Sequence, residues 1–349
     1  MMKRMLSVCL ALLLILMPMG ALAEKIGVSM PTKHLQRWIQ DGENMMGQLQ
    51  AAGYDVELVY ADQDVENQIG QVDALLSNGA KVLIIAAIDS SSLIGVLEKA
   101  KALSVPVIAY DRLIRESDAV SYYATFDNYK VGTIQGSFVE AQLGLAAGNG
   151  PFNLEFTGGA PEDNNAQFFF QGAYDVLKPY IDNGQLIVQS GQMDFYTVAT
   201  LSWSTEIAQA RMLNILNTFY ADKQIDAVVC ANDSTALGIS NALIEAGYDQ
   251  FPIVTGQDCD KDNIRNMISG RQSMSIFKDT RLLAGRVVTM VDDILSGNAP
   301  EINDITTYDN GVMIVPTYLC QPEFVDPDNY RAVLIDSGYY TEADIAVAE

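Results

Sequence analysis

Short apolar runs alternate with longer stretches of helical periodicity along most of this chain. In the runs, apolar residues fill successive positions instead of every second one, as at residues 82–87 and 107–110. Runs of this kind are typical of strands buried on both faces of a parallel sheet. Because amphipathic helical stretches separate them, the pattern predicts an α/β protein with doubly wound parallel sheets.

The alternation pauses near Asp127 and then begins again. The first series predicts strands at 25–30, 56–60, 82–87, 107–110 and 120–125, with helices at 36–51, 65–78 and 91–103. The second series predicts strands at 152–156, 186–189, 227–230 and 253–255, with its clearest helices at 207–220 and 234–246. A strand at 275–278, a helix at 281–295 and a strand at 312–315 follow. Two halves of similar size therefore stand in tandem.

The last predicted elements indicate that neither half is continuous in sequence. The linker 298–310 and the segment after Pro316 resemble connections that return from one half to the other. We therefore expect one lobe of residues 24–127 plus 279–312 and a second lobe of residues 128–278 plus 313–349. A length of 349 residues suits two such domains.

The first 23 residues form a separate unit with the features of a secretory signal peptide. Lys3 and Arg4 precede an almost entirely apolar stretch, and Ala21-Leu22-Ala23 has the small residues of a cleavage site. The apolar stretch is shorter than the roughly 20 residues that span a bilayer. We expect cleavage before Glu24 and, since no lipid-attachment cysteine stands at that point, a free periplasmic protein.

Charge and cysteine content exclude two classes of protein. Removing Lys3 and Arg4 with the leader changes the formal net charge from −23 to −25, which repels nucleic acid. Cys230, Cys259 and Cys320 remain, and an odd, widely spaced set fits neither a disulfide framework nor a zinc site. Buried free thiols are the favoured interpretation, and a bridge between the first two is the alternative.

Polar residues directly follow several predicted strands. Asp111 and Arg112 come after the strand at 107–110, while Asn232 and Asp258 follow two strands of the second half. In open α/β sheets, ligands bind outside the carboxyl ends of the strands. The sequence therefore predicts a polar ligand site along this rim.

Features of common catalytic and metal sites are scarce. The single histidine, His34, has no triad context, and the chain shows no nucleophile elbow, phosphate loop or dinucleotide-binding glycine motif. Asp258, Asp260 and Asp262 lack the glycine and glutamate of a calcium loop, so we interpret them as a solvated helix N-terminus. No metal or cofactor is expected. Carboxylates at the rim leave an exported, glycosidase-like enzyme open as the alternative function.

Charged groups and aromatic rings occur together at the predicted rim. Carboxylates accept hydrogen bonds from sugar hydroxyls, cationic and amide groups donate to them, and aromatic rings stack on the C–H faces of a pyranose. Other interpretations remain open at single positions. Trp203 also fits an ordinary core or surface aromatic, Asn165 a helix cap, and Asp111-Arg112 an internal ion pair.

A set of short motifs then gives a specific resemblance. The motifs are Met30-Pro-Thr-Lys33 with Arg37-Trp38, Tyr110-Asp-Arg-Leu-Ile114, Tyr122-Tyr-Ala-Thr-Phe-Asp-Asn128, Asp163-Asn-Asn165, Ser190-Gly-Gln192, Gly256-Gln-Asp258 and Ile276-Phe-Lys-Asp-Thr280. In this order and spacing the chain resembles the bacterial periplasmic sugar-binding proteins of the ribose/xylose/galactose group, above all the xylose-binding and multiple-sugar-binding branch. The resemblance extends from about Lys25 to Tyr340. It implies the periplasmic binding protein type I fold, with two Rossmann-like lobes joined by three crossovers near Asp127, Lys278 and Val312.

The resemblance also implies a function. Such proteins close on one monosaccharide and deliver it to a membrane ABC-type permease, and some also signal to a membrane chemoreceptor or sensor kinase. We expect a monomeric receptor, not an enzyme, for an aldopyranose such as xylose, glucose, galactose or arabinose. The ligand-binding residues carried over are Lys33, Arg37, Trp38, Asp111, Arg112, Asn165, Trp203, Asn232, Asp258 and Lys278. Where ribose-binding relatives have an arginine, this chain has Phe168–Phe170, which favours a pyranose and adds Phe169 to the expected site.

Overall fold

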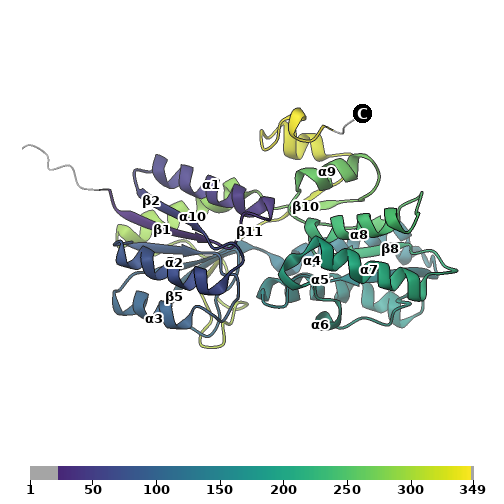
Figure 1. The fold of residues 1–349 in the computed structure, drawn as a ribbon, viewed down its shortest axis with the longest axis horizontal. Helices are drawn as coiled ribbons and strands as arrows, with labels where there is room; N and C mark the ends of the chain where they lie inside the picture. The colour runs from purple at the N-terminus through teal and green to yellow at the C-terminus, as the bar shows by residue number, and fades with distance from the viewer. Residues whose placement is uncertain (1–22, 347–349) are drawn as a thin grey trace, which may run out of the picture.

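Two α/β lobes lie side by side in the computed structural model, which describes residues 23–346 (Figure 1). Residues 1–22 of the expected signal peptide lie outside the described residues. Within the described range, no helix has the length and apolar character needed to cross a membrane.

The first lobe is built on a six-stranded parallel sheet in the order β11-β5-β4-β3-β1-β2. Its strands are β1 (Lys25–Met30), β2 (Asp55–Tyr60), β3 (Val82–Ile85), β4 (Val107–Tyr110), β5 (Val120–Phe126) and β11 (Thr317–Cys320). Its helices are α1 (Gln36–Ala51), α2 (Val65–Ser77), α3 (Ile94–Ala102) and α10 (Thr280–Leu295). Helices α1 and α10 pack on one face and α2 and α3 on the other, so alternate strand residues such as Leu83 and Ile84 enter different cores. Burial on both faces explains the continuous apolar runs.

The second lobe has a four-stranded parallel sheet in the order β7-β6-β8-β9 and an antiparallel pair, β10 with β12. Its strands are β6 (Phe152–Thr157), β7 (Leu186–Ile187), β8 (Ala227–Cys230), β9 (Ile253–Val254), β10 (Ser275–Phe277) and β12 (Glu323–Val325). Its helices are α4 (Asn128–Leu143), α5 (Asn164–Asp182), α6 (Phe195–Val198), α7 (Thr205–Phe219), α8 (Asp233–Glu245) and α9 (Lys261–Ile268). Short helical turns occupy Leu145–Ala147, Leu201–Trp203, Arg331–Ile335 and Glu342–Asp344.

Glycines let α4 and α5 approach closely, and this contact fixes the helix that enters the ligand cavity. A Cβ on Gly132 would lie 2.0 Å from the carbonyl oxygen of Phe169, and one on Gly172 would lie 2.2 Å from that of Tyr129. Both distances are far below a van der Waals contact, so only glycine fits at either position.

The chain crosses between the lobes after β5, after β10 and after β11. The first two crossovers lie near Asp127 and Lys278, as expected. The third prediction, a strand at 312–315 with a crossover near Val312, was wrong. Val312 is 56% exposed and belongs to a surface loop, whereas Thr317–Cys320 pairs with β5 in the first lobe. We therefore propose lobes of residues 24–127 plus 279–320 and 128–278 plus 321–346 in place of the expected boundary at 313.

All three cysteines in the described part of the chain, Cys230, Cys259 and Cys320, are free and buried. The preferred interpretation as buried thiols is confirmed, and the alternative bridge between Cys230 and Cys259 is not formed.

Candidate functional site

A cavity lies between the lobes, at the carboxyl ends of their parallel strands. Its lining consists of Leu35, Arg37, Trp38, Asp111, Arg112, Asp163, Asn165, Phe169, Trp203, Asn232, Gln257, Asp258, Asp260 and Lys278. The rim predicted from the strand ends is therefore a real concavity to which both lobes contribute.

The backbone is strained at three cavity residues: Asp111, Asp258 and Trp203, whose φ is 58°. Asp111 and Asp258 have φ values of 59° and 99°, a region that residues with a Cβ seldom adopt. At Asp111, three donors hold the backbone carbonyl: Tyr123 Oη at 2.5 Å, Thr125 Oγ1 at 2.8 Å and Asn165 Nδ2 at 2.7 Å. A strained backbone conformation persists where several neighbouring contacts hold it in place, and such strain is concentrated at ligand sites. Asn165 thus serves the site by fixing Asp111 from the opposite lobe.

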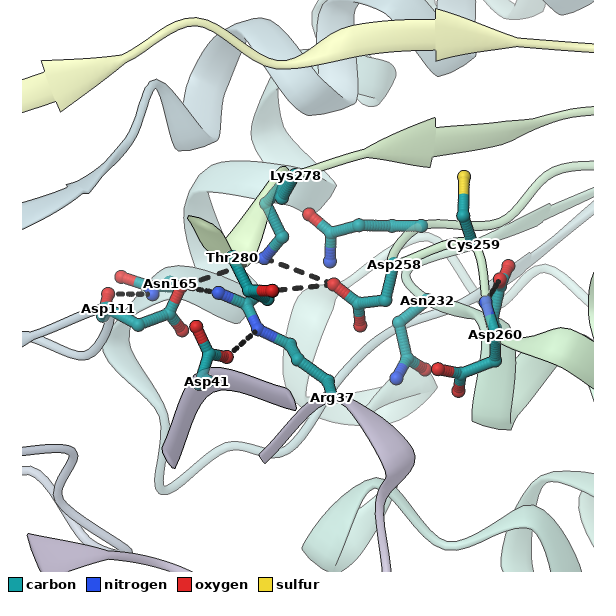
Figure 2. A network of polar contacts seen from close by, with 12 residues as sticks. Arg37, Asp41, Asp111, Asn165, Asn232, Asp258, Cys259, Asp260, Lys278 and Thr280 are labelled. Carbon is teal, nitrogen blue, oxygen red and sulfur yellow. Dashed lines mark hydrogen bonds and ion pairs between the residues drawn. The ribbon is translucent and has the colours of Figure 1, made fainter. Parts of the chain in front are cut away.

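Arg37 is the centre of the polar network in the cavity (Figure 2). It projects from α1 and is 6% exposed. Its Nε lies 3.0 Å from Asp41 Oδ2, its Nη1 lies 3.0 Å from Asp258 Oδ1, and its Nη2 donates to Asp111 Oδ2. Lys278 Nζ lies 3.3 Å from the same oxygen of Asp258 and 3.8 Å from Asp111. Arg37 thereby joins the first lobe to the second through Asp258.

The two carboxyls that face Arg37 from its own lobe respond differently to burial. For Asp111, burial opposes ionisation, but Arg37, Lys278 and Arg112 outweigh it and hold its pKa below the ordinary value. For Asp41, burial dominates and raises the pKa, against the attraction of Arg37. Asp111 is therefore a fixed anion that orients Arg37 and Lys278 beside the cavity.

A second ion pair joins the lobes through Arg112. Its Nε lies 2.9 Å from Asp163 Oδ2, and its Nη1 donates to the carbonyl oxygens of Ala87 and Ile88 at 3.0 and 3.2 Å. Its guanidinium carbon lies 5.0 Å from the ring centroid of Trp38. Asp111 and Arg112 are thus in internal ion pairs, each with residues of other elements.

Aromatic rings form the apolar part of the wall. Trp203 and Phe169 meet edge to face with centroids 6.3 Å apart, and Lys278 Nζ lies 5.5 Å from the Phe169 centroid. Phe168 and Phe170 pack instead against tyrosines of the lobe interiors. Of the three consecutive phenylalanines, Phe169 is the one that lines the cavity.

Four buried polar atoms of cavity residues have no hydrogen-bond partner. Arg112 Nε lies in the ion pair with Asp163, and the other three are Trp203 Nε1, Gln257 Oε1 and Asp260 Oδ1. Burying a polar group without a partner costs about 1–3 kcal/mol, so such atoms are rare in folded proteins. Trp203 Nε1, Gln257 Oε1 and Asp260 Oδ1 thus supply one donor and two acceptors beside a cavity that the rings of Trp203 and Phe169 also line. The arrangement suits a small ligand that carries several hydroxyl groups and apolar C–H faces.

Ten of the eleven expected site residues line the cavity, and Lys33 does not. Lys33 is exposed, and its Nζ lies 4.8 Å from the ring centroid of Tyr60. Asn232 lines the cavity and also caps α8, where its side chain accepts from the backbone N–H of Thr235. The expectation missed Leu35, Asp163, Gln257 and Asp260.

Asp260 corrects the interpretation of the acidic cluster as a solvated helix N-terminus. It is the N-cap residue of α9, but one of its carboxylate oxygens is buried at the cavity. Of the three aspartates, only Asp262 is exposed like a solvated helix end. Within residues 23–346, no group of three or more histidine, cysteine or acidic side chains is placed to hold a metal ion.

The family model for the periplasmic binding protein domain matches residues 26–299. The chain belongs to the periplasmic binding protein domain family. The resemblance seen in the sequence motifs is therefore confirmed, and the two lobes with three crossovers are the type I fold of this family.

Several members of the family are similar to this chain over nearly their whole length. The multiple sugar-binding periplasmic protein SbpA of Azospirillum brasilense is 50% identical over 322 residues, covering 91% of this chain and 90% of the relative. The multiple sugar-binding periplasmic receptor ChvE of Rhizobium radiobacter is 51% identical over 319 residues, covering 90% of each. The crystal structure of an ABC transporter solute-binding protein from Clostridium phytofermentans with bound β-D-glucose has a TM-score of 0.91 and 58% identity, covering 93% of this chain and 100% of that one.

Asp260 should make the stability of this periplasmic binding protein depend on pH. Burial raises its pKa well above the ordinary value, and Asp233 and Asp258 raise it further. A carboxyl with a raised folded-state pKa stabilises the fold below its unfolded-state pKa of about 4, and this contribution is lost as the pH rises through the folded-state value. Asp260→Asn, a neutral isostere, should therefore lose less stability than the wild type as the pH rises above about 4.

Thermal unfolding of both proteins across this pH range measures the effect. Asp262→Asn is the matched control, because Asp262 lies on the same helix with a side chain that is 69% exposed. Its profile should run parallel to the wild type. If the stability of Asp260→Asn also followed the wild type across this pH range, the pKa of Asp260 would not be raised in the folded protein.

Proposed function

We propose that this chain is the solute receptor of an ABC-type sugar permease and that it binds one monosaccharide in the cavity between its lobes. The observation that carries the proposal is the set of unpaired polar atoms, Trp203 Nε1, Gln257 Oε1 and Asp260 Oδ1, beside the rings of Trp203 and Phe169. Sugar hydroxyls both donate and accept, so one ligand of this class would pair with all three atoms.

The proposed ligand class is the aldopyranoses, with D-glucose and D-xylose as the first to test. The multiple-sugar names of SbpA and ChvE and the bound β-D-glucose of the Clostridium phytofermentans protein support this class. Trp203 and Phe169 would stack on the apolar faces of the ring. Asp258, Lys278, Arg112 and Asn232 would exchange hydrogen bonds with its hydroxyls.

The proposed mechanism is closure of the two lobes around the sugar. In the conformation described here, the Arg37–Asp258 and Arg112–Asp163 pairs both cross from one lobe to the other. Ligand and ion pairs would therefore stabilise the same closed state. A permease would distinguish the loaded receptor by the relative position of the lobes.

The remaining parts of the proposal concern location and partners. We propose export with removal of residues 1–23, action in the periplasm as a monomer, and no nucleic-acid partner or cofactor. The periplasmic names of SbpA and ChvE support the location. A membrane chemoreceptor or sensor kinase is the proposed second partner beside the permease.

An enzymatic role is less well supported than a receptor role. A glycosidase needs one carboxyl that holds a proton beside a second that is ionised. Arg37 and Lys278 each contact both Asp111 and Asp258, and the pKa of Asp111 is lowered. Asp111 and Asp258 thus orient cations. Asp260 and Asp163 are the cavity carboxyls with raised pKa values, but the relatives are named as binding proteins and not as enzymes. Incubation with nitrophenyl glycosides should therefore release no nitrophenol.

A thermal-shift screen of the mature protein against aldopentoses and aldohexoses tests the proposal. A ligand at 100 times its Kd adds about 2.7 kcal/mol to the free energy of unfolding, which raises the melting temperature clearly. We expect a shift with one or several aldopyranoses. The absence of a shift with every monosaccharide, or hydrolysis of a glycoside, would overturn the proposed function.

A further inference from the structure

The C-terminal segment, residues 326–346, is part of the second lobe. It follows β12 and lies beside α9, as the yellow segment in Figure 1. Leu334, Tyr340 and Ile345 are buried in one cluster with residues of α9 and β10. Lys261 Nζ lies 2.5 Å from Asp344 Oδ1. These contacts anchor the segment to the second lobe.

Tyr340 extends from this segment to the first lobe. Its hydroxyl accepts hydrogen bonds from Gln36 Nε2 at 2.6 Å and from Gln40 Nε2 at 3.0 Å, both on α1. The same hydroxyl donates to the carbonyl oxygen of Cys259 at 2.9 Å. The side chain is buried, and it does not line the ligand cavity.

The neighbours of Tyr340 are adjacent in sequence to the central ion pair of the site. Gln36 precedes Arg37 on α1, and Gln36 and Gln40 share one helix face because they are four residues apart. Cys259 directly follows Asp258. The hydroxyl therefore links the backbone turn that carries Asp258 to the helix that carries Arg37.

We propose that Tyr340 is a latch between the lobes, a positioning residue that stabilises the closed conformation without touching the ligand. This inference rests on the proposed function. Separation of α1 from the second lobe deprives the amides of Gln36 and Gln40 of their shared acceptor. Since only the closed state holds the sugar fully, the observed affinity scales with the closed fraction. Tyr340 thus sets the strength of binding for every sugar, while the cavity residues set the choice among sugars.

Tyr340→Phe tests the latch because it removes the hydroxyl and keeps the ring. We expect the Kd for D-glucose and for D-xylose to rise by the same factor, about tenfold, which corresponds to about 1.4 kcal/mol. Tyr196→Phe is the matched control. Tyr196 Oη also accepts from a glutamine, Gln167 Nε2 at 3.0 Å, but both residues belong to the second lobe. Its Kd values should stay within twofold of the wild type.

The ligand-free closed fraction gives a readout that does not depend on sugar. Spin labels on Leu103→Cys and Ile244→Cys, which are 54% and 48% exposed on different lobes, report the interlobe distance. The ratio of closed to open protein should fall about tenfold in Tyr340→Phe. If the wild type binds no sugar, the proposed function is wrong. The interlobe distances still test whether Tyr340 stabilises the closed conformation.

Two results would overturn the latch. One is an unchanged Kd together with an unchanged closed fraction in Tyr340→Phe. The other is a change in the ratio of the two Kd values, which would mean that Tyr340 acts through contacts to the ligand. If Tyr340→Phe folds poorly, Gln40→Ala removes one donor from the other lobe and leaves the bond from Lys261 N–H to Gln36 Oε1 in place. It must raise both Kd values by one common factor.

Discussion

Replacing Arg37 with methionine is expected to weaken monosaccharide binding about a thousandfold, or about 4 kcal/mol. The guanidinium contacts Asp41, Asp111 and Asp258 at once, and it is almost completely buried. Methionine fills a similar volume but leaves three carboxylates without the guanidinium, and Lys278 contacts only Asp111 and Asp258 among them. Removing one partner of a buried pair typically costs 3–5 kcal/mol because the other charge stays uncompensated.

The substitution also removes the contact from α1 to Asp258, and so it opposes closure as well as disturbing the cavity. Calorimetric titration with D-glucose measures the loss of affinity, and thermal unfolding measures the loss of stability. Arg286→Met is the control, because Arg286 pairs with Glu301, whose side chain is 67% exposed. Surface pairs contribute about 0–1 kcal/mol, so this variant should bind within twofold of the wild type. Near-normal binding by Arg37→Met would show that the network is structural only.

A methyl group at position 159 is expected to weaken binding about a hundredfold, or about 2.7 kcal/mol. A Cβ on Gly159 would lie 2.0 Å from Trp203 Cη2 and 2.3 Å from Cζ3. The indole must therefore move in Gly159→Ala. Because Trp203 lines the cavity and carries an unpaired Nε1, any such movement changes the stacking surface and displaces a donor.

The neighbouring glycine provides the control for this substitution. A Cβ on Gly158 would meet Val198 Cγ2 at 3.2 Å, a contact that small shifts relieve. Gly158→Ala should therefore bind sugar within about threefold of the wild type. The chain has two tryptophans, Trp38 and Trp203, so a change of indole fluorescence would report the displacement directly. Normal affinity in Gly159→Ala would exclude Trp203 from the binding surface.

Strong local patterns made much of the fold predictable. The strand Lys25–Met30 and the helix Gln36–Ala51 have the predicted bounds, because one is a continuous apolar run and the other has clear helical periodicity. The same reasoning failed at Val312, where an apolar run lies in a surface loop. An apolar run shows only that a segment could form a strand. Which segment does so depends on pairing with a neighbouring strand, and the segment that pairs with β5 is Thr317–Cys320.

The site was predictable where a strand end or a helix face fixes the direction of a side chain. Arg37 and Trp38 lie on α1, which points them at the cavity, whereas Lys33 precedes the helix and turns outward to Tyr60. The burial of Asp260 was not predictable, because it depends on distant parts of the chain that converge near it. Such contacts leave no local signal in the sequence.

Calorimetric titration of residues 24–349 with D-glucose and D-xylose is the most direct test of the central claim. We predict saturable binding of at least one of them at a single site per chain, lost in Arg37→Met and kept in Arg286→Met. Failure of both sugars, and also of D-galactose and L-arabinose, to bind the folded protein would contradict the account.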